Sequence, residues 1–390
     1  MQFIKRHLTT ELIEMSKCYP VVTIIGPRQS GKTTLVKTLF PNKPYVSLED
    51  LDERDFAKND PKGFLARYPD GAIFDEIQRL PDLLSYIQTI VDKQNKNGIF
   101  ILTGSNQQML HQAVTQSLAG RTAILKLLPF SISEIKDLVS DFSADDFIYN
   151  GMHPRTYMNK INPTKYFRDY IQTYIEKDVR QILNIKDLTT FQHFLKLCAS
   201  RVGQIFNSHA IANELGISHQ TVKNWLSVLE ASFLIIRLQP YFENFGKRVI
   251  KSPKIYFTDV GLAAYLLNID NVDQVFRDPL RGNLFENLMV IDIYKEFLNR
   301  GKEPPLYFYR DSNLKEVDLL CKLGNNLIPI EIKSSQTFSS KFLSGLDYFQ
   351  KLLGKRCPHG FLIYTGDQEQ KVHDFDVLNF KNMNEVQKNL

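Results

Sequence analysis

Short apolar runs alternate with longer amphipathic stretches through the first third of the chain. The apolar runs predicted to be strands are residues 21–25, 44–48, 72–75, 99–103 and 122–127. Runs that are apolar throughout, rather than at every second position, are typical of strands buried on both faces of a parallel sheet. With helices predicted between them, these runs indicate an α/β fold built on a five-stranded parallel sheet.

A loop bounded by two glycines separates the first of these strands from the helix predicted over residues 34–40. Gly26 and Gly31 permit backbone angles that a side chain forbids, so that successive N–H groups can point toward one anion. The strand, the loop and the helix N-terminus together predict a binding site for a nucleoside triphosphate. We expect Lys32 to reach the β- and γ-phosphates and the Thr33 hydroxyl to ligate Mg²⁺. The nucleotide-binding residues of this motif are Gly26, Pro27, Arg28, Gln29, Ser30, Gly31, Lys32, Thr33 and Thr34.

Acidic and polar residues follow two later strands of the same sheet. Asp75 ends the third strand and is expected to hold Mg²⁺ through its waters, while Glu76 polarises the attacking water. The alternative is that the two acids only cap the following helix. Ser105 and Asn106, after the fourth strand, are candidates to touch the γ-phosphate or the water, or else form a plain polar turn. All these residues follow strands, and ligands bind at the carboxyl ends of strands in such sheets.

One arginine, Arg121, precedes the strand predicted over residues 122–127. An arginine suits a transition state rich in phosphate charge, and either the same subunit or a neighbouring one can supply it. Supply by a neighbour predicts a homo-oligomer. The alternative is an ordinary surface arginine at the start of a strand.

Residues 208–230 have the spacing of a helix-turn-helix, with a small Ala212, a turn at Gly216 and a buried Val222. A strand over 233–238, a basic stretch and a strand over 254–257 follow, which is the order of a winged helix with a basic wing. The residues expected to contact DNA are Gln220, Thr221, Lys223 and Asn224 on the second helix and Lys247, Arg248 and Lys251 on the wing. The alternative is a winged helix that serves packing or protein contact.

The last hundred residues carry acids in a helix–strand–strand order. Glu286 lies on a predicted helix over 283–294, and Asp318 and Glu331 lie on strands joined by a hairpin. Carboxylates that meet across a hairpin suit Mg²⁺ or Mn²⁺, and Lys333 beside them can stabilise phosphate charge. This pattern resembles the metal-dependent nuclease fold of restriction enzymes and Holliday-junction resolvases. The alternatives are a nuclease fold that has lost its chemistry, or a structural cluster of salt bridges.

The motifs GPRQSGKTTL, AIFDEIQ, ILTGSN and SLAGR, in this order, resemble the AAA-superfamily ATPases of bacteria and archaea that carry a C-terminal domain of unknown function. The resemblance continues through residues 151–154, 174–179, 256–262 and 285–287, and so covers nearly the whole chain. It implies an AAA-like fold and identifies the expected nucleotide as ATP, bound with Mg²⁺. It does not imply a settled cellular role.

Composition places few further limits on the chain. Of its 390 residues, 43% are hydrophobic and 23% charged, as in ordinary globular proteins, and the net charge of +5 permits but does not require a nucleic-acid partner. The four cysteines are scattered without zinc spacing, which favours free thiols in a reducing compartment. The chain shows neither a signal peptide nor an apolar run long enough to span a bilayer, so we expect a cytoplasmic protein with no membrane partner.

The sequence therefore predicts four parts: an AAA-like ATPase over 1–130, a helical connector over 131–188, a winged helix over 189–280 and a restriction-endonuclease-like domain over 281–390. The expected function is ATP hydrolysis linked to an action on DNA, in repair, recombination or defence. The alternative is a nucleotide-dependent switch or scaffold whose C-terminal domain binds protein or DNA without cutting it.

Overall fold

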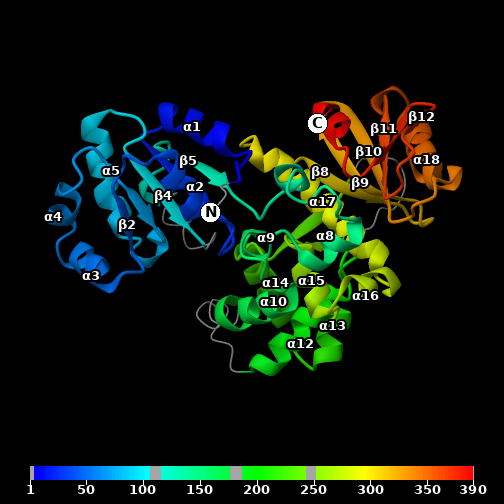
Figure 1. Ribbon diagram of the computed structural model, residues 1–390, viewed down its shortest axis with the longest axis horizontal. Helices are drawn as coiled ribbons and strands as arrows, with labels where there is room; N and C mark the ends of the chain where they lie inside the picture. The colour runs from blue at the N-terminus through cyan, green and yellow to red at the C-terminus, as the bar shows by residue number, and fades with distance from the viewer. Residues whose placement is uncertain (1–3, 106–115, 176–186, 243–251, 390) are drawn as a thin grey trace. The chain divides into compact units, whose positions relative to one another are not determined.

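The computed structural model describes residues 4–105, 116–175, 187–242 and 252–389 (Figure 1). The chain forms two compact units. The first unit consists of residues 1–130, 231–234 and 297–302, and the second unit contains the remainder. Each unit is described by itself.

The sheet of the first unit has five strands in the order β2-β3-β4-β1-β5, and every neighbouring pair is parallel. The strands are β1 (Val21–Ile25), β2 (Tyr45–Ser47), β3 (Ile73–Asp75), β4 (Phe100–Gly104) and β5 (Thr122–Lys126). They fall within the predicted ranges or differ by one residue at an end, so the predicted parallel sheet is confirmed. All residues of β1 are buried, because this strand lies inside the sheet between β4 and β5.

Helices cover both faces of this sheet. They are α1 (Thr9–Cys18), α2 (Lys32–Leu39), α3 (Leu51–Asn59), α4 (Pro61–Ala66), the short η1 (Ile77–Arg79) and α5 (Leu83–Gln94). On one face, Leu12 of α1 and Leu35 of α2 pack with the strand residue Val22. An aromatic group includes Phe64 of α4, whose ring lies 5.6 Å from that of Phe74 on β3. The result is a three-layer α/β arrangement.

The second unit begins with helices. They are α7 (Ile132–Ile135), α8 (Ala144–Asn150), α9 (Pro154–Met158), α10 (Pro163–Tyr170), the π-helix η2 (Ile171–Ile175), α12 (Leu188–Ala199), α13 (Ser208–Leu215), α14 (His219–Ala231), α15 (Val260–Leu266) and α16 (Val272–Arg277). Two motifs distant in sequence meet here, because the Asp259 carboxylate accepts the N–H groups of Met152 and Gly261 at 2.8 and 2.9 Å. A Cβ on Gly261 would lie 2.6 Å from the Cα of Gly151, so this approach requires glycine.

An eight-stranded mixed sheet completes the second unit, in the order β12-β13-β11-β10-β9-β8-β6-β7. The strands are β6 (Ile235–Pro240), β7 (Lys254–Phe257), β8 (Leu306–Arg310), β9 (Glu316–Leu323), β10 (Asn326–Lys333), β11 (Gly360–Tyr364), β12 (Gln370–Val372) and β13 (Phe375–Asn379). The accompanying helices are α17 (Arg281–Asn299), η3 (Ser340–Leu343), α18 (Ser344–Leu353), η4 (Gly354–Arg356) and α19 (Asn384–Asn389).

The two strands expected for the winged helix belong to this same sheet. β6 pairs with β7 on one edge, antiparallel, and with β8 on the other, parallel. The residues that the sequence assigns to separate parts over 189–280 and 281–390 are therefore joined by backbone hydrogen bonds. β8, β9 and β10 form antiparallel neighbours, and β11 then pairs parallel to β10.

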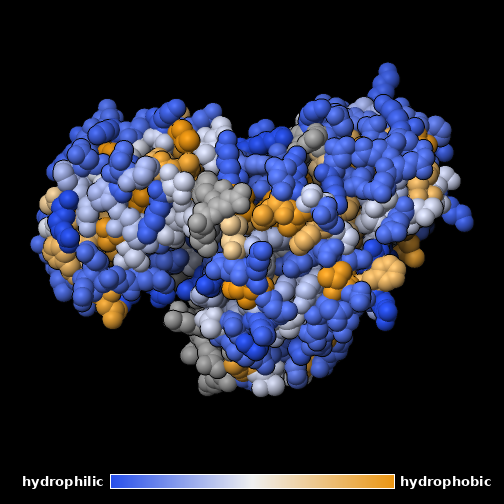
Figure 2. All heavy atoms as spheres, viewed as in Figure 1, coloured by the Kyte–Doolittle hydropathy of each residue, from blue (hydrophilic) through white to orange (hydrophobic). Residues whose placement is uncertain are grey.

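The surface drawn in Figure 2 is mostly hydrophilic over both units. Large apolar side chains that remain more than half exposed are Leu51, Phe242, Phe276 and Leu314. Within the described ranges, no helix is both long enough and apolar enough to cross a bilayer.

Candidate functional site

The phosphate loop follows β1 and turns directly into α2. Gly26 must be glycine because a Cβ there would lie 2.1 Å from the carbonyl oxygen of Leu127. Gly31, the residue before α2, has φ +95°, a left-handed value that favours glycine. The loop is therefore fixed between β5 and the first turn of α2.

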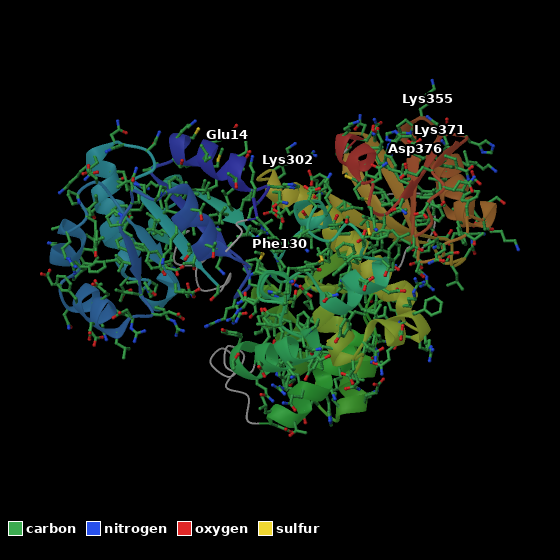
Figure 3. The ribbon with its side chains drawn as sticks, viewed as in Figure 1. Glu14, Phe130, Lys302, Lys355, Lys371 and Asp376 are labelled. Atoms are coloured by element: carbon green, nitrogen blue, oxygen red, sulfur yellow. The ribbon has the colours of Figure 1, made fainter. Side chains whose placement is uncertain are left out.

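A buried arginine from the N-terminal segment holds the loop from behind. The Arg6 guanidinium donates to the carbonyl oxygens of Ser30 and Leu128, at 2.7 Å each. Its guanidinium carbon also lies 4.9 Å from the ring centre of Phe130, labelled in Figure 3. Arg6 thus connects the loop to the chain that leaves β5, a contact that the sequence did not predict.

Lys32 begins α2 and is buried, with its ammonium group turned toward the loop. Its Nζ donates to the carbonyl oxygens of Gly26 and Pro27 at 2.9 and 2.8 Å. Burial lowers the pKa of Lys32, an effect that the acids Glu76 and Asp75 oppose. A cation held inside the loop in this way suits the phosphates of a nucleotide.

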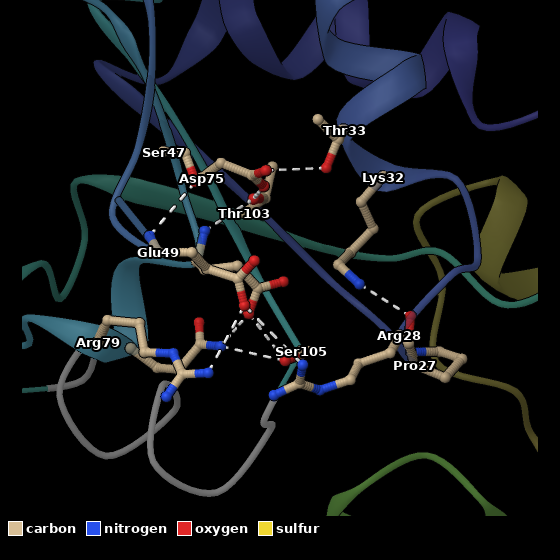
Figure 4. A network of polar contacts seen from close by, with 12 residues as sticks. Pro27, Arg28, Lys32, Thr33, Ser47, Glu49, Asp75, Arg79, Thr103 and Ser105 are labelled. Atoms are coloured by element: carbon tan, nitrogen blue, oxygen red, sulfur yellow. Dashed lines mark hydrogen bonds and ion pairs between the residues drawn. The ribbon is translucent and has the colours of Figure 1, made fainter. Parts of the chain in front are cut away.

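Asp75 at the end of β3 accepts three side-chain hydroxyl groups, and Figure 4 shows two of the donors, Thr33 and Thr103. Its Oδ2 accepts from Thr33 at 2.9 Å and from Tyr45 at 2.7 Å, and its Oδ1 accepts from Thr103. The structure thus brings Thr33 and Asp75 together, as the sequence predicted. A hydroxyl next to a buried carboxylate, beside a phosphate loop, suits Mg²⁺ bound with a nucleotide.

Glu76 follows directly and has φ +58°, the left-handed region that a non-glycine residue rarely adopts. Its Oε2 accepts from Ser105 at 2.9 Å and from Gln78, and Gln78 also donates to Ser105 at 3.1 Å. The Glu76 N–H donates to Thr103 at 3.3 Å. The carboxylate is therefore oriented by polar groups from the residue after β4 and from the η1 turn.

The other residues predicted to contact the nucleotide include Gln29, Thr34 and Asn106. Gln29 adopts a left-handed φ of +62°, and Thr34 is exposed on the first turn of α2. Asn106 lies outside the described residues. The polar partners that sequence reasoning missed are Tyr45, Gln78 and Thr103; each stands within a few residues of the carboxyl end of a strand, which is the signal that could have found them.

Arg121 lies at the opposite edge of the sheet from the phosphate loop. It precedes β5, and its carbonyl accepts the N–H of Val21 at the start of β1, whereas the loop follows the end of β1. A strand of this length spans about 16 Å. The guanidinium instead pairs with Asp92 of α5, at 2.5 and 2.9 Å. Arg121 therefore does not reach the phosphate loop of its own chain.

A second polar cluster lies in the second unit, around Lys254 of β7. Lys254 is 2% exposed, and its Nζ pairs with Glu286 of α17 at 2.9 Å and with Glu316 of β9 at 2.6 Å. The Tyr256 hydroxyl donates to Glu286 at 2.5 Å. Burial acts to lower the pKa of Lys254, but Glu286 and the other acids raise it well above its ordinary value. The lysine therefore stays charged.

The other predicted acids meet beside it, at the end of β10. Lys333 Nζ pairs with Asp318 at 3.3 Å and with Glu331 at 2.5 Å, and the N–H of Ile332 donates to Asp318 at 2.9 Å. Burial and the neighbouring Asp318 raise the pKa of Glu331 to about 8. Oε2 of Glu331 is buried without a hydrogen-bond partner. Glu331 is 7% exposed, so its side chain is buried, like those of Ile330 and Ile332 on the same strand.

Two lysines therefore occupy the carboxylates that were expected to bind a metal. Among the described residues, no group of three or more His, Cys, Asp or Glu side chains is arranged to hold a metal ion. The expected set of Glu286, Asp318 and Glu331 gains no support as a metal centre. Lys254 and Glu316, which the sequence did not single out, belong to the cluster instead.

The helices α13 and α14 are joined by a short turn in which Gly216 has φ +65°. Trp225 of α14 packs on Phe191 and Phe194 of α12, at ring distances of 5.3 and 5.4 Å. The residues predicted to contact DNA on α14 are Gln220, Lys223 and Asn224, which are exposed, and Thr221, which is partly exposed. The predicted wing residues Lys247, Arg248 and Lys251 lie outside the described residues.

Comparison with known proteins agrees with this arrangement. A model described as an AAA domain matches residues 19–136, and two domains of unknown function, DUF8612 and DUF4143, match residues 141–273 and 281–383. An uncharacterized protein of Mycobacterium tuberculosis is 30% identical over 322 residues, which are 82% of this chain and 71% of that protein. The chain belongs to the AAA-superfamily ATPases with C-terminal domains of unknown function.

More distant relatives of this AAA-superfamily ATPase are also found. An uncharacterized protein of Haemophilus influenzae is 22% identical over 356 residues, 83% of this chain and 84% of that protein. Among solved structures, the Walker-type ATPase of Pyrococcus abyssi has a TM-score of 0.47 at 16% identity and covers 68% of this chain and 96% of its own. The RuvB Holliday junction branch migration motor of Thermotoga maritima has a TM-score of 0.32 at 21% identity, with 60% and 90% covered.

Proposed function

We propose that this AAA-superfamily ATPase hydrolyses ATP at the carboxyl edge of the β2-β3-β4-β1-β5 sheet. The observation that carries the proposal is the pair of acids at the end of β3. The Asp75 carboxylate lies 2.9 Å from the Thr33 hydroxyl, while the Glu76 carboxylate accepts hydrogen bonds from Ser105 and Gln78 instead. One acid is thereby available to a metal and the other to a water.

Each group in the site has a distinct role in this proposal. The loop N–H groups and Lys32 bind the phosphates, and Thr33 with Asp75 holds Mg²⁺, which neutralises phosphate charge when it is bound. Glu76 accepts a proton from the attacking water, and Ser105 orients that carboxylate.

Arg121 has a role only between subunits in this proposal. Since it lies at the amino edge of its own sheet, it can reach a nucleotide only in a neighbouring copy. That role requires a homo-oligomer and release of the guanidinium from Asp92. An Arg121→Ala chain that hydrolyses ATP normally at high protein concentration would exclude it.

The test of hydrolysis is a comparison of Glu76→Gln with wild type. Loss of the proton acceptor should lower the turnover number by about 10²–10⁴-fold, while ATP binding is retained because the loop and Lys32 are unchanged. Glu14→Gln is the matched control, since Glu14 is exposed on α1 of the same unit. A turnover number that is equal in Glu76→Gln and wild type contradicts the proposal.

We propose as a second function that the second unit binds DNA. Supporting it are the α13–turn–α14 arrangement, the packing of α14 on α12 through Trp225, and an exposed polar face that carries Lys223. A helix presented in this way fits the major groove, and basic residues on phosphates make binding fall with salt. Lys223→Ala should weaken DNA binding and reduce its salt dependence. An unchanged salt slope for this variant and for Lys247→Ala/Arg248→Ala favours a role in protein contact instead.

We also propose that the second unit cleaves DNA at the polar cluster that contains Lys254 and Lys333. The order of Glu286, Asp318, Glu331 and Lys333 on helix, strand and strand supports it, whereas their ion pairs with lysines weigh against a bound metal. Asp318→Ala/Lys333→Ala should abolish nicking of plasmid, single-stranded and branched DNA with Mn²⁺. Equal residual nicking by the variant and wild type means a contaminant, and then the switch or scaffold function is favoured.

A further inference from the structure

Two arginines lie beside the Glu76 group: Arg28, one of the predicted nucleotide-binding residues, and Arg79, which the sequence did not single out. Arg28 stands in the phosphate loop after β1, and Arg79 ends the η1 turn that Glu76 begins. From these two sides the guanidinium groups extend toward Ser105 (Figure 4). They therefore lie at the edge of the sheet where the phosphates of a nucleotide bind.

Both arginines share one carboxylate, that of Glu49 just after β2. Oε1 of Glu49 lies 3.9 Å from Arg28 and 3.5 Å from Arg79, which are long distances for ion pairs. The Glu49 side chain is 51% exposed, whereas those of Arg28 and Arg79 are only 16% and 25% exposed. An exposed carboxylate at this range contributes little, so Glu49 neutralises the sheltered Arg79 guanidinium incompletely.

Arg79 has a further unmet requirement. Its Nε is buried and donates to no acceptor in the part of the chain that the structure describes. A guanidinium group presents its N–H donors as a planar fork that matches two oxygens of a phosphate. The Arg79 guanidinium therefore has a donor without an acceptor close to Glu76, and a phosphate oxygen could accept from it.

We propose that Arg79 and Arg28 bind the γ-phosphate of ATP within the same chain, and that Glu49 holds them until the nucleotide arrives. This inference rests on the proposed ATP hydrolysis and deepens it. Arg79 follows Glu76 by three residues in one turn, so an arginine drawn to the γ-phosphate also moves the segment that carries the water-activating acid. Arg121 lies at the edge of the sheet opposite to the phosphate loop. Arg79 and Arg28 therefore supply the arginine charge that the γ-phosphate receives from its own chain.

The other reading is that the Arg28–Glu49–Arg79 group only ties β1 to β2. The two readings differ in what Glu49 does. If the ion pairs serve only to stabilise the fold, replacing Glu49 and replacing Arg79 should change ATP binding to the same extent. If the arginines serve the phosphate, loss of Glu49 frees them for ATP, and only loss of an arginine weakens ATP binding.

The experiment compares binding of ADP and of a non-hydrolysable ATP analogue, both with Mg²⁺, to the full chain and its variants. Arg79→Ala should weaken binding of the analogue by about tenfold or more, which is the contribution of a charged hydrogen bond. The affinity for ADP should stay within about twofold of the wild-type value. Arg28→Ala should do the same. Glu49→Gln should leave the analogue equal or tighter, and Arg67→Ala, which loses a 3.4 Å surface pair with Glu53, is the matched control.

The inference is overturned if Arg79→Ala loses affinity for ADP and for the analogue equally. It is also overturned if Glu49→Gln loses as much affinity for the analogue as Arg79→Ala does. Thermal unfolding of each variant separates these outcomes from loss of folding, and Arg79→Lys provides a second variant that keeps the charge but not the fork. If wild type binds neither nucleotide, the proposed function fails as well. Normal nucleotide binding with no selective loss refutes this inference alone.

Discussion

Replacing Lys254 by methionine removes the central cation of the cluster in the second unit while keeping the length of the side chain. In the wild type, the Lys254 ammonium lies 2.9 Å from Glu286 and 2.6 Å from Glu316. Methionine leaves Glu286, whose side chain is only 12% exposed, without its cation. We expect a large loss of stability, since removing one partner strands a buried charge.

The magnitude follows from which contacts remain. Breaking a buried pair costs about 3–5 kcal/mol. Glu316 keeps Arg310 at 3.1 Å and Glu286 keeps the Tyr256 hydroxyl, so we expect the lower end, about 3 kcal/mol at pH 8.

The loss should depend on pH. Burial already raises the pKa of Glu286, and loss of Lys254 raises it further. An acid with a raised pKa in the folded state contributes most to stability below its unfolded pKa of about 4.3, and that contribution is lost as pH rises through the folded value. Lys254→Met should therefore be much less destabilised, relative to wild type, at pH 5 than at pH 8.

The assay is urea unfolding followed by fluorescence. The chain has a single tryptophan, Trp225, which is buried in the same unit as Lys254. The double variant Lys254→Met/Glu286→Gln should regain part of the loss, because it leaves no buried charge unpaired. Lys355→Met is the control, since Lys355 points into solvent (Figure 3). The reasoning is refuted if the single and double variants unfold alike, or if the loss is the same at both pH values.

Three further changes test other contacts. Gly26→Ala places a Cβ 2.1 Å from the Leu127 carbonyl oxygen, so ATP binding should fall by more than about tenfold in a titration while circular dichroism is unchanged. Tyr45→Phe removes a hydroxyl donor to Asp75 and should raise the Mg²⁺ concentration needed for half-maximal ATPase rate by about 3–10-fold, with ADP binding retained. Burial raises the pKa of Asp292 from 3.8 to about 6, so its ionisation should cost about 3 kcal/mol as pH rises through 6, and Asp292→Asn should remove that slope from urea unfolding between pH 4 and 7.

The first sheet could be predicted because its signals are local. Apolar runs, the loop between Gly26 and Gly31, and the acids at residues 75 and 76 each occupy a few consecutive positions. The position of Arg121 could also have been derived. In a parallel sheet, residues that precede a strand lie at the edge opposite to those that follow one, so a residue before β5 cannot lie beside the loop after β1.

Side chains that arrive from distant segments could not be predicted in the same way. Lys254 follows a basic stretch in the sequence and so resembles a surface residue, yet it is buried by partners on α17 and β9. Burial of a charged lysine is costly unless acceptors or opposite charges approach it, and the carboxylates of Glu286 and Glu316 lie 32 and 62 positions later in the sequence. The pairing of β6 with β8 and the hydrogen bonds between Asn287 of α17 and Phe257 of β7 bring these segments together.

Charge balance separates the chemistry of the two sites. Beside the phosphate loop, the buried Nε of Arg79 donates to no acceptor among the described residues, so an added anion is favoured there. The cluster of the second unit has more acidic than basic side chains. Its four acids are Glu286, Glu316, Asp318 and Glu331, and its three cations are Lys254, Lys333 and Arg310. One negative charge remains, which a single proton satisfies. A divalent metal would have to displace a lysine, so cleavage, if it occurs, should require that Lys254 or Lys333 first leaves its carboxylates for the DNA phosphate.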